Sequence, residues 1–253
     1  MHLAFFDIDG ALALGKYVPD SAKEGIRQLR EKGDLVFICT GRNVHYVRAN
    51  FGEYADGFIT NNGRLAYYRD EVIFDAPLEK KMFRKIMKIL REENAGFVFH
   101  DKNNGYYEGP EELYELMKEV GDPGYLKWHI DEDKEYYNFD ICLFDSEHCE
   151  RIRKALENYC ILNPHGPHPS ADMSVFGTDK GDALKAVAGK LGVDINDTYA
   201  FGDGLNDVCM MKAAGHGIAM GNGQDLTKQA AEYITSDINE DGVYLGLKHY
   251  GLI

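Results

Sequence analysis

Four short apolar runs constrain the fold of this chain more than any other feature of its sequence. Each run is five or six residues long and ends at a small polar or acidic residue that precedes a helical pattern. Apolar runs of this length are typical of parallel strands covered by helices on both sides. The runs and the residues that follow them are 2–6 before Asp7, 34–39 before Thr40, 56–60 before Asn61 and 197–202 before Asp203.

A helical pattern between the first two runs supports this interpretation. Ser21, followed three residues later by Glu24, predicts a capping box at the start of a helix, and Gly33 predicts its end. We therefore expect an α/β fold with a Rossmann-like core, in which a parallel sheet carries helices on both faces.

The sequence from residue 77 to residue 176 has a different pattern. Apolar and polar side chains alternate here, as in the run from Tyr137 to Leu143, and Tyr and Phe are frequent. Alternation with a period of two is typical of half-buried antiparallel strands. We expect two domains: residues 1–76 and 177–253 together form the core, and residues 77–176 form an α+β domain inserted into it.

Charge and cysteine content exclude several classes of function. The chain has 28 Lys and Arg residues against 42 Asp and Glu residues, and its net charge of −14 repels polyanions, so nucleic acid is not an expected partner. No apolar run approaches the roughly 18 to 20 residues that a membrane span needs, so no membrane partner is expected. Five scattered cysteines without a CxxC pair favour free thiols in a reducing compartment, and we expect a cytoplasmic protein. Nothing in the sequence indicates the oligomeric state.

Two acidic clusters lie directly after apolar runs. Asp7 and Asp9 form the first, before Gly10, and Asp203 and Asp207 belong to the second. Because ligands of open parallel sheets bind beyond the carboxyl ends of the strands, we expect both clusters in one crevice. Two close carboxylates raise each other's pKa unless a cation intervenes, so the first pair indicates a shared proton or a metal ion. A solvated turn explains that pair alone equally well, but two such clusters favour Mg²⁺, which binds carboxylate and amide oxygens.

Groups that can bind an anion are also present. Thr40 and Gly41 can offer a hydroxyl and backbone N–H groups, although a Thr at the start of a helix is usually an N-cap. Lys180 follows Asp179, a predicted N-cap, and so lies at the positive end of a helix. The acidic surface repels phosphorylated molecules, so a phosphate ligand would need local groups of this kind.

Seven motifs in the predicted core resemble those of the haloacid dehalogenase (HAD) superfamily, and specifically its Cof-type phosphatases. They occur in the order found in that family and cover nearly all of the core, whereas residues 77–176 match only in length and in their mixture of strands and helices. In this family a cap domain is inserted between the third core strand and the lysine motif. The motifs are DIDGA at 7–11, TGR at 40–42, NNG at 61–63, KGDAL at 180–184, FGDGLND at 201–207, AMGNG at 219–223 and DINEDGV at 237–243.

The resemblance implies a role in phosphoryl transfer for each matching residue. Asp7 would attack phosphorus and form an aspartyl-phosphate, and Asp9 would protonate the leaving oxygen and then activate water. Mg²⁺ would be held by the Asp7 carboxylate, the backbone carbonyl of Asp9 and Asp203, with Asp207 behind these ligands. The family more often has Thr at the position of Ala11, where we expect the backbone N–H to matter more than a hydroxyl. The groups that would hold the phosphoryl oxygens and the substrate belong to Lys180, Thr40, Gly41, Arg42 and Asn206.

We therefore expect a Mg²⁺-dependent phosphatase that hydrolyses small phosphorylated metabolites, either sugar phosphates or phosphorylated cofactors. Two alternatives remain open: a phosphomutase that acts on hexose phosphates, and a catalytically idle protein that binds a phosphorylated metabolite in a regulatory role. The presence of both Asp7 and Asp9 argues against the second, because binding alone does not need both. His165 and His168 lie in a proline-rich segment and are further candidate metal ligands, although such a segment is more often a loop without a metal.

Overall fold

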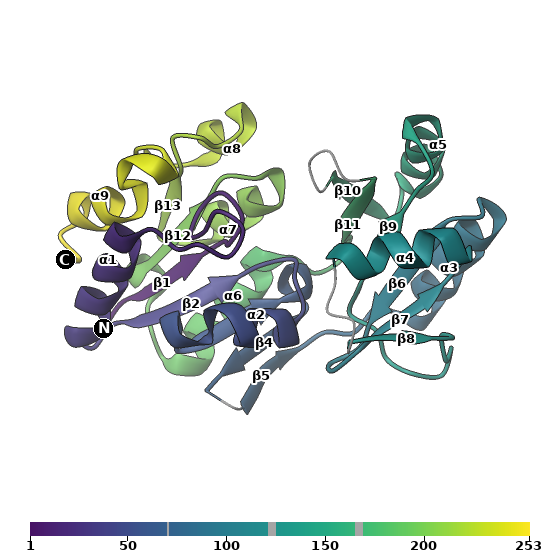
Figure 1. The fold of residues 1–253 in the computed structure, drawn as a ribbon. Coiled ribbons are helices and arrows are strands. Elements are labelled where there is room, and N and C mark those ends of the chain that lie inside the picture. Colours follow the sequence, from purple (N-terminus) through teal and green to yellow (C-terminus); the bar gives the residue numbers. More distant parts are fainter. Residues whose placement is uncertain (70, 121–124, 165–168) are drawn as a thin grey trace. The chain divides into compact units, whose positions relative to one another are not determined.

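The computed structural model describes residues 1–69, 71–120, 125–164 and 169–253, which form two compact units (Figure 1). The first unit consists of Met1–Thr40, Val47–Asp75 and Asp179–Ile253, so both ends of the chain belong to it. The second unit consists of Gly41–Tyr46 and Ala76–Thr178. The division into domains at residues 77 and 176 stays a prediction, and the candidate ligands His165 and His168 lie outside the described residues.

A mixed sheet forms the centre of the first unit. Its strands are β1 (Leu3–Phe6), β2 (Leu35–Cys39), β3 (Gly57–Thr60), β4 (Leu65–Tyr68), β5 (Glu71–Asp75), β12 (Thr198–Gly202), β13 (His216–Ala219) and β14 (Tyr233–Ile234). Within the described residues the order is β14-β13-β12-β1-β2-β3-β4-β5. Neighbours from β14 to β3 are parallel, whereas β4 pairs antiparallel with both β3 and β5. The predicted parallel core is confirmed, with an antiparallel hairpin added at one edge.

The central strand β1 joins segments from the two ends of the sequence. It pairs in parallel with β12 on one side and with β2 on the other, so that Phe6 lies opposite both Phe201 and Ile38. All four residues of β1 are buried, as expected for a strand with helices on both faces. The carboxyl ends of β1, β2 and β12 therefore lie at the same edge of the sheet.

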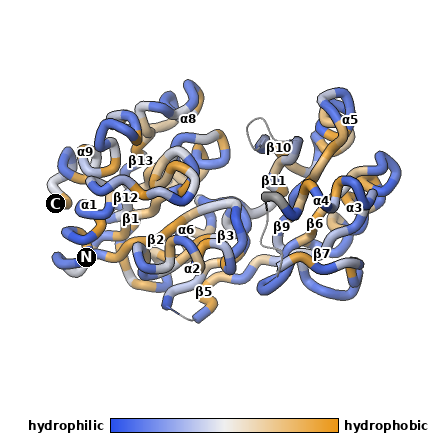
Figure 2. Tube along the Cα trace, viewed as in Figure 1, coloured by the Kyte–Doolittle hydropathy of each residue, from blue (hydrophilic) through white to orange (hydrophobic). Residues whose placement is uncertain are grey.

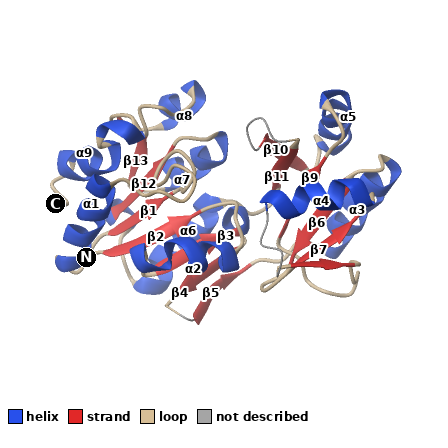
Figure 3. Cartoon of the chain, viewed as in Figure 1, coloured by secondary structure: helices blue, strands red, loops and turns tan. Residues whose placement is uncertain are grey.

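Helices cover both faces of this sheet, as predicted (Figure 3). On one face, Leu184 of α6 and Met210 of α7 pack in the same core as Phe5. On the other face, α9 contacts α1, and Gly246 of α9 lies so close to Phe201 that an added Cβ would be 2.6 Å from its ring. These helices are α1 (Asp20–Glu31), α6 (Lys180–Leu191), α7 (Val208–Ala213), α8 (Asp225–Ala230) and α9 (Gly242–His249), and α2 (Val44–Phe51) runs from the second unit into the first.

The start of α1 differs from the prediction, and its end does not. The capping box of Ser21 and Glu24 is wrong, because the helix begins at Asp20 and Pro19 is its N-cap without a side-chain hydrogen bond. Proline has a fixed φ, here −57°, which favours a helix that starts directly after it. Gly33 follows the end of the helix with a φ of +86°, a conformation that glycine adopts readily.

The second unit contains a sheet of its own with mostly antiparallel pairs, as the alternating pattern predicted. Its strands are β6 (Gly96–His100), β7 (Gly105–Glu108), β8 (Leu126–Trp128), β9 (Asn138–Cys142), β10 (Cys160–Pro164) and β11 (Ser170–Val175). In the part that the structure describes, the order is β10-β11-β9-β6-β7-β8, and β7 and β8 are parallel. The helices α3 (Lys80–Glu92) and α5 (Ser146–Leu156) share a core with Phe97 and Phe99, and α4 (Glu111–Val120) packs Leu113 near Val98.

Apolar residues concentrate in the strands of both sheets (Figure 2). The five cysteines all lie in described segments and are free thiols, three of them buried. Among the described residues, no helix combines the length and the apolar character that crossing a membrane requires.

Candidate active site

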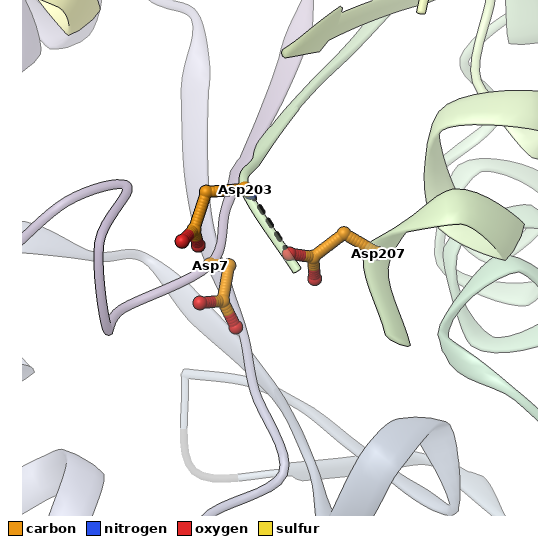
Figure 4. Close-up of side chains that lie close together, drawn as sticks. All are labelled: Asp7, Asp203 and Asp207. Carbon is orange, nitrogen blue, oxygen red and sulfur yellow. Dashed lines mark hydrogen bonds between the residues drawn. The ribbon is translucent and has the colours of Figure 1, made fainter. Parts of the chain in front are cut away.

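Three carboxylates meet at the carboxyl edge of the first unit's sheet. Asp7 directly follows β1 and Asp203 directly follows β12, and these two strands are parallel neighbours. Asp207 ends the 3₁₀ turn Leu205–Asp207, which begins three residues after the last residue of β12. One oxygen of each carboxylate lies within 4.8 Å of the others (Figure 4). We call these three residues the acidic cluster.

Lys180 brings a positive charge into hydrogen-bond contact with this cluster. Its Nζ donates to Asp7 Oδ1 and to Asp207 Oδ1, each at 2.7 Å, and its side chain is 1% exposed. The predicted N-cap Asp179 is confirmed, because its side chain accepts from the backbone N–H groups of Gly181 and Asp182. The cap begins α6 directly before Lys180 and so fixes the point from which its side chain enters the site.

The acidic cluster holds more negative than positive charge. Three ionised carboxylates and one ammonium leave a net charge of −2, and like charges within 4.8 Å of each other repel by at least about 3 kcal/mol at an effective dielectric constant of about 20. Burial, and after it the charge of Asp207, raises the pKa of Asp7 well above its usual value. The same two causes raise the pKa of Asp203 to about 7. Burial alone would lower the pKa of Lys180, but Asp207 and Asp7 raise it well above its usual value.

These residues fit a divalent cation. Raised pKa values at Asp7 and Asp203 mean that the cluster, as it stands, lacks positive charge. A divalent ion would supply the two missing charges, and carboxylate oxygens are the ligands that Mg²⁺ prefers. The donor set therefore agrees with the prediction of magnesium.

Two glycines allow the loops of the cluster to approach each other. Gly10 has a φ of +89°, and a Cβ at this position would lie 2.4 Å from Asp203 Oδ2. A Cβ at Gly202 would lie 2.5 Å from the Cβ of Asp207. Distances below 3.0 Å are not tolerated, so the glycines of the DIDGA and FGDGLND motifs are required by packing as well as by turn geometry.

Asp207 shapes the loop that carries Asp203. Its Oδ2 accepts from the backbone N–H of Asp203 at 3.1 Å and of Gly204 at 3.0 Å, while its Oδ1 accepts from Lys180. Both oxygens of this carboxylate are therefore engaged by the protein. Buried Asp207 therefore holds Lys180 and the backbone of Asp203 and Gly204 in place.

Asp9 differs from Asp7 in its environment. Asp7 is buried, whereas Asp9 is exposed on the turn that follows β1. The turn is closed by hydrogen bonds from Gly10 N to Ala13 O and from Ala13 N to Ile8 O. The predicted pair thus consists of one carboxylate fixed inside the cluster and one presented at the surface.

Two of the predicted phosphate ligands are linked through a residue that was given no role. The amide of Asn206 donates to Asn62 Oδ1 at 3.3 Å, and the backbone N–H of Asn62 donates to the carbonyl of Thr40 at 3.1 Å. Asn62 belongs to the NNG motif, and its position two residues after the apolar run 56–60 is the signal that could have identified it. Its φ of +51° places it in the left-handed region, where asparagine is more frequent than most residues.

Gly41 and Arg42 belong to the second compact unit. The guanidinium of Arg42 lies over the ring of Tyr46, 4.6 Å from its centroid. The structure describes these residues with that unit and not with the acidic cluster, so their part in binding phosphate stays a prediction.

The fold and this site define a class of hydrolase. Residues 4–247 match the family described as haloacid dehalogenase-like hydrolase, and the chain belongs to this family. The resemblance predicted from the seven motifs is therefore confirmed.

Curated relatives and solved structures place the chain more closely. It is 32% identical over 262 residues to the "Putative phosphatase YkrA" of Bacillus subtilis (strain 168), a match that covers 99% of this chain and 98% of the relative. It is 30% identical over 254 residues to the 5-amino-6-(5-phospho-D-ribitylamino)uracil phosphatase YcsE of the same organism, covering 99% and 96%. The structure of the HAD subclass IIB sugar phosphatase BT4131 matches with a TM-score of 0.82 and 25% identity, covering 100% of both chains. The phosphatase class predicted from the sequence is supported by all three.

Proposed function

We propose that this protein is a Mg²⁺-dependent phosphatase that hydrolyses small phosphorylated metabolites, sugar phosphates or phosphorylated cofactors, through an aspartyl-phosphate. The observation that carries the proposal is the buried Asp7 carboxylate, bound by Lys180 and surrounded by two further carboxylates. The names of YcsE and BT4131 describe phosphatases of a ribityl compound and of a sugar, and both support a hydroxyl-rich phosphate ester as substrate. The free thiols fit a reducing compartment, and we place the reaction in the cytoplasm.

Asp7, Asp203 and the backbone carbonyl of Asp9 are the groups that would hold Mg²⁺. Asp207 would stay outside the direct ligands, because Lys180 and two backbone N–H groups already engage its oxygens. When bound, the ion supplies positive charge that cancels the repulsion between a carboxylate and a phosphate dianion.

The first step is a displacement at phosphorus by Asp7. A carboxylate oxygen of Asp7 forms a bond to phosphorus as the bond to the alcohol oxygen breaks, and Asp9 gives its proton to that oxygen. Lys180, Thr40 and Asn206 hold the phosphoryl oxygens during the transfer. The products are the free alcohol and an aspartyl-phosphate at Asp7.

The second step returns the enzyme to its starting state. Asp9, now ionised, takes a proton from a water molecule, whose oxygen attacks phosphorus and displaces the Asp7 carboxylate. Inorganic phosphate leaves and Asp9 is protonated again. The exposed position of Asp9 suits both tasks, because it must reach first the leaving alcohol and then water.

The decisive test is Asp7→Asn. We expect the rate of hydrolysis of 4-nitrophenyl phosphate to fall by at least about 10⁴-fold, the scale of loss when a nucleophile is removed. Asp20→Asn is a matched control on the exposed first turn of α1, and it should keep full activity. EDTA should abolish the wild-type activity, and added Mg²⁺ should restore it. Activity that survives both the substitution and the chelator would refute the proposal.

The alternatives make different predictions. A phosphomutase would convert one hexose phosphate into its isomer without releasing phosphate, which phosphorus NMR detects directly. An idle binding protein would bind members of a panel of phosphate esters and turn over none of them. Release of inorganic phosphate from the panel would exclude the idle binder and favour the phosphatase.

A further inference from the structure

Asn222 connects three loops that are far apart in the sequence. It lies between β13 and α8, and its Nδ2 donates to the carbonyl of Gly10 at 2.7 Å. Its Oδ1 accepts from the backbone N–H of Ile238 at 3.0 Å. One exposed side chain therefore ties the turn after β1 to the loop that precedes α9.

The Gly10 backbone is held from three directions. Its N–H donates to Ala13 O at 3.0 Å, and its carbonyl accepts from Asn222. Its Cα faces the carboxylate of Asp203, because an added Cβ would lie 2.4 Å from Oδ2. Asp9 directly precedes this peptide and lies outside the sheet, so the direction of its side chain depends on how the turn is fixed.

The loop that carries Asn222 is anchored to the strand end beside the acidic cluster. Met220 N donates to Gly202 O at 3.0 Å, and Gln224 N donates to Asp203 O at 2.9 Å. These bonds bracket Asn222 on both sides. The loop that carries the Asn222 amide is therefore held by hydrogen bonds to the same backbone segment that positions Asp203.

We propose that Asn222 is a positioning residue for Asp9. By fixing the Gly10 carbonyl, its amide holds the turn in the conformation that presents Asp9 to the leaving alcohol. This inference rests on the proposed function, in which Asp9 is the acid of the first step. It predicts that loss of the amide weakens proton delivery to the alcohol more than it weakens displacement itself.

The test uses Asn222→Asp, which keeps an acceptor for Ile238 N and removes the donor to Gly10 O. The substrates are 4-nitrophenyl phosphate, whose alcohol leaves readily without a proton, and 4-nitrobenzyl phosphate, whose alcohol needs one. Values of kcat/KM report only the first irreversible step for both. We expect a fall of about 10 to 100-fold for the benzyl ester, part of the 10² to 10⁴-fold that a general acid contributes, and of less than about 3-fold for the phenyl ester.

A double-mutant cycle separates positioning from a merely structural role. In an Asp9→Ala background the acid is absent, so Asn222→Asp should lower kcat/KM for the benzyl ester by less than about 3-fold. Asn222→Ala removes both bonds and should show the same selectivity, which keeps the test valid if the aspartate variant is unstable. Asn239→Ala is the control, because the Asn239 amide donates to Asp237 Oδ1 at 3.1 Å in the neighbouring loop, and it should leave the ratio of the two esters unchanged.

Equal losses for both esters, no loss, or the same loss with and without Asp9 would each overturn the inference. None of these results would affect the proposed function, which is tested separately by Asp7→Asn, by chelation and by the release of phosphate.

Discussion

Buried polar side chains at one place in each compact unit differ sharply in their hydrogen bonding. In the first unit, buried Asp7, Lys180 and Asp207 are ionisable and are joined by two hydrogen bonds of 2.7 Å. In the second unit, Asn138 on β9 is 0% exposed, and neither atom of its amide has a hydrogen-bond partner among the described residues. The first arrangement concentrates charge at one edge of a sheet, and the second leaves a neutral amide in the interior.

The difference teaches that a buried polar group is not by itself a sign of chemistry. Removing one member of a buried ion pair leaves a buried charge without compensation. Replacing an unpartnered amide with an apolar side chain breaks no hydrogen bond, so it should cost little stability. The site of the first unit is recognisable because its charges depend on one another. The following substitutions test how far this contrast holds.

Lys180→Met should give the largest effect on stability. It leaves Asp7 and Asp207 buried without their ammonium, and the free energy of unfolding in urea at pH 8 should fall by about 3–5 kcal/mol. Lys185→Met on the exposed face of the same helix should change it by no more than about 0.5 kcal/mol. A loss below about 1 kcal/mol at Lys180 would show that the two carboxylates do not rely on it.

Magnesium should stabilise the protein more at pH 8 than at pH 5.5. The pKa of Asp203 is about 7 in the folded protein, above its ordinary value, so this carboxyl stabilises the metal-free fold at low pH and loses that contribution as pH rises through about 7. Mg²⁺ must displace the same proton, so its effect grows as the proton leaves. At about 100 times its Kd the ion should add about 2.7 kcal/mol, measured by thermal unfolding with and without Mg²⁺.

Asp203→Asn is the control for this measurement. It removes the titrating ligand, and both the gain from Mg²⁺ and its dependence on pH should shrink. An equal gain from Mg²⁺ at the two pH values in the wild type would contradict the assignment of Asp203 as a ligand.

Gly63→Ala and Gly33→Ala separate packing at the site from backbone strain. Both glycines have a positive φ, of +93° and +86°, but a Cβ at Gly63 would lie 2.1 Å from the backbone of Asp179, whereas nothing lies within 4 Å at Gly33. Gly63→Ala should therefore cost about 1–3 kcal/mol more than Gly33→Ala, because the backbone must move at the start of α6. Equal costs in urea unfolding would mean that α6 can shift freely.

Asn138→Leu should have the smallest effect. Its amide atoms lack partners among the described residues, so an apolar side chain of similar size should change the free energy of unfolding by less than about 1 kcal/mol. Asn163→Leu is the matched control in the same unit, since that amide donates to Ser174 Oγ at 2.9 Å. A loss above about 2 kcal/mol at Asn138 would reveal a buried water bound to its amide.

The sequence predicted those parts of the site that depend on strand ends. Asp7 and Asp203 each follow an apolar run, and parallel strands bring such residues to one edge, so their meeting could be anticipated. The bonds of Lys180 to the carboxylates could not, because the resemblance assigned this ammonium to phosphate and periodicity does not give side-chain directions. The contact of Asn222 with Gly10 spans 212 residues and depends on loop geometry, for which no local pattern exists.

The start of α1 was predicted wrongly because two local sequence signals indicate different first residues. The capping box at Ser21 was a valid pattern, but with Pro19 as the N-cap α1 starts two residues earlier than that box requires. The parallel core was predicted from apolar runs alone, whereas the pairing of β12 with β1 was not predicted, because no feature of either run indicates which strand lies beside it.

The place of β1 between β2 and β12 has a consequence for biosynthesis. Asp7 leaves the ribosome early, while Lys180 and Asp203 follow nearly two hundred residues later, which at about 5–20 residues per second is a delay of roughly 10–40 s. Throughout that interval the edge of β1 that will pair with β12 has no native neighbour, so it is open to non-native strand pairing. A nascent chain of this design gains catalytic competence only when translation is almost complete, and chaperones have their greatest opportunity to act on it before then.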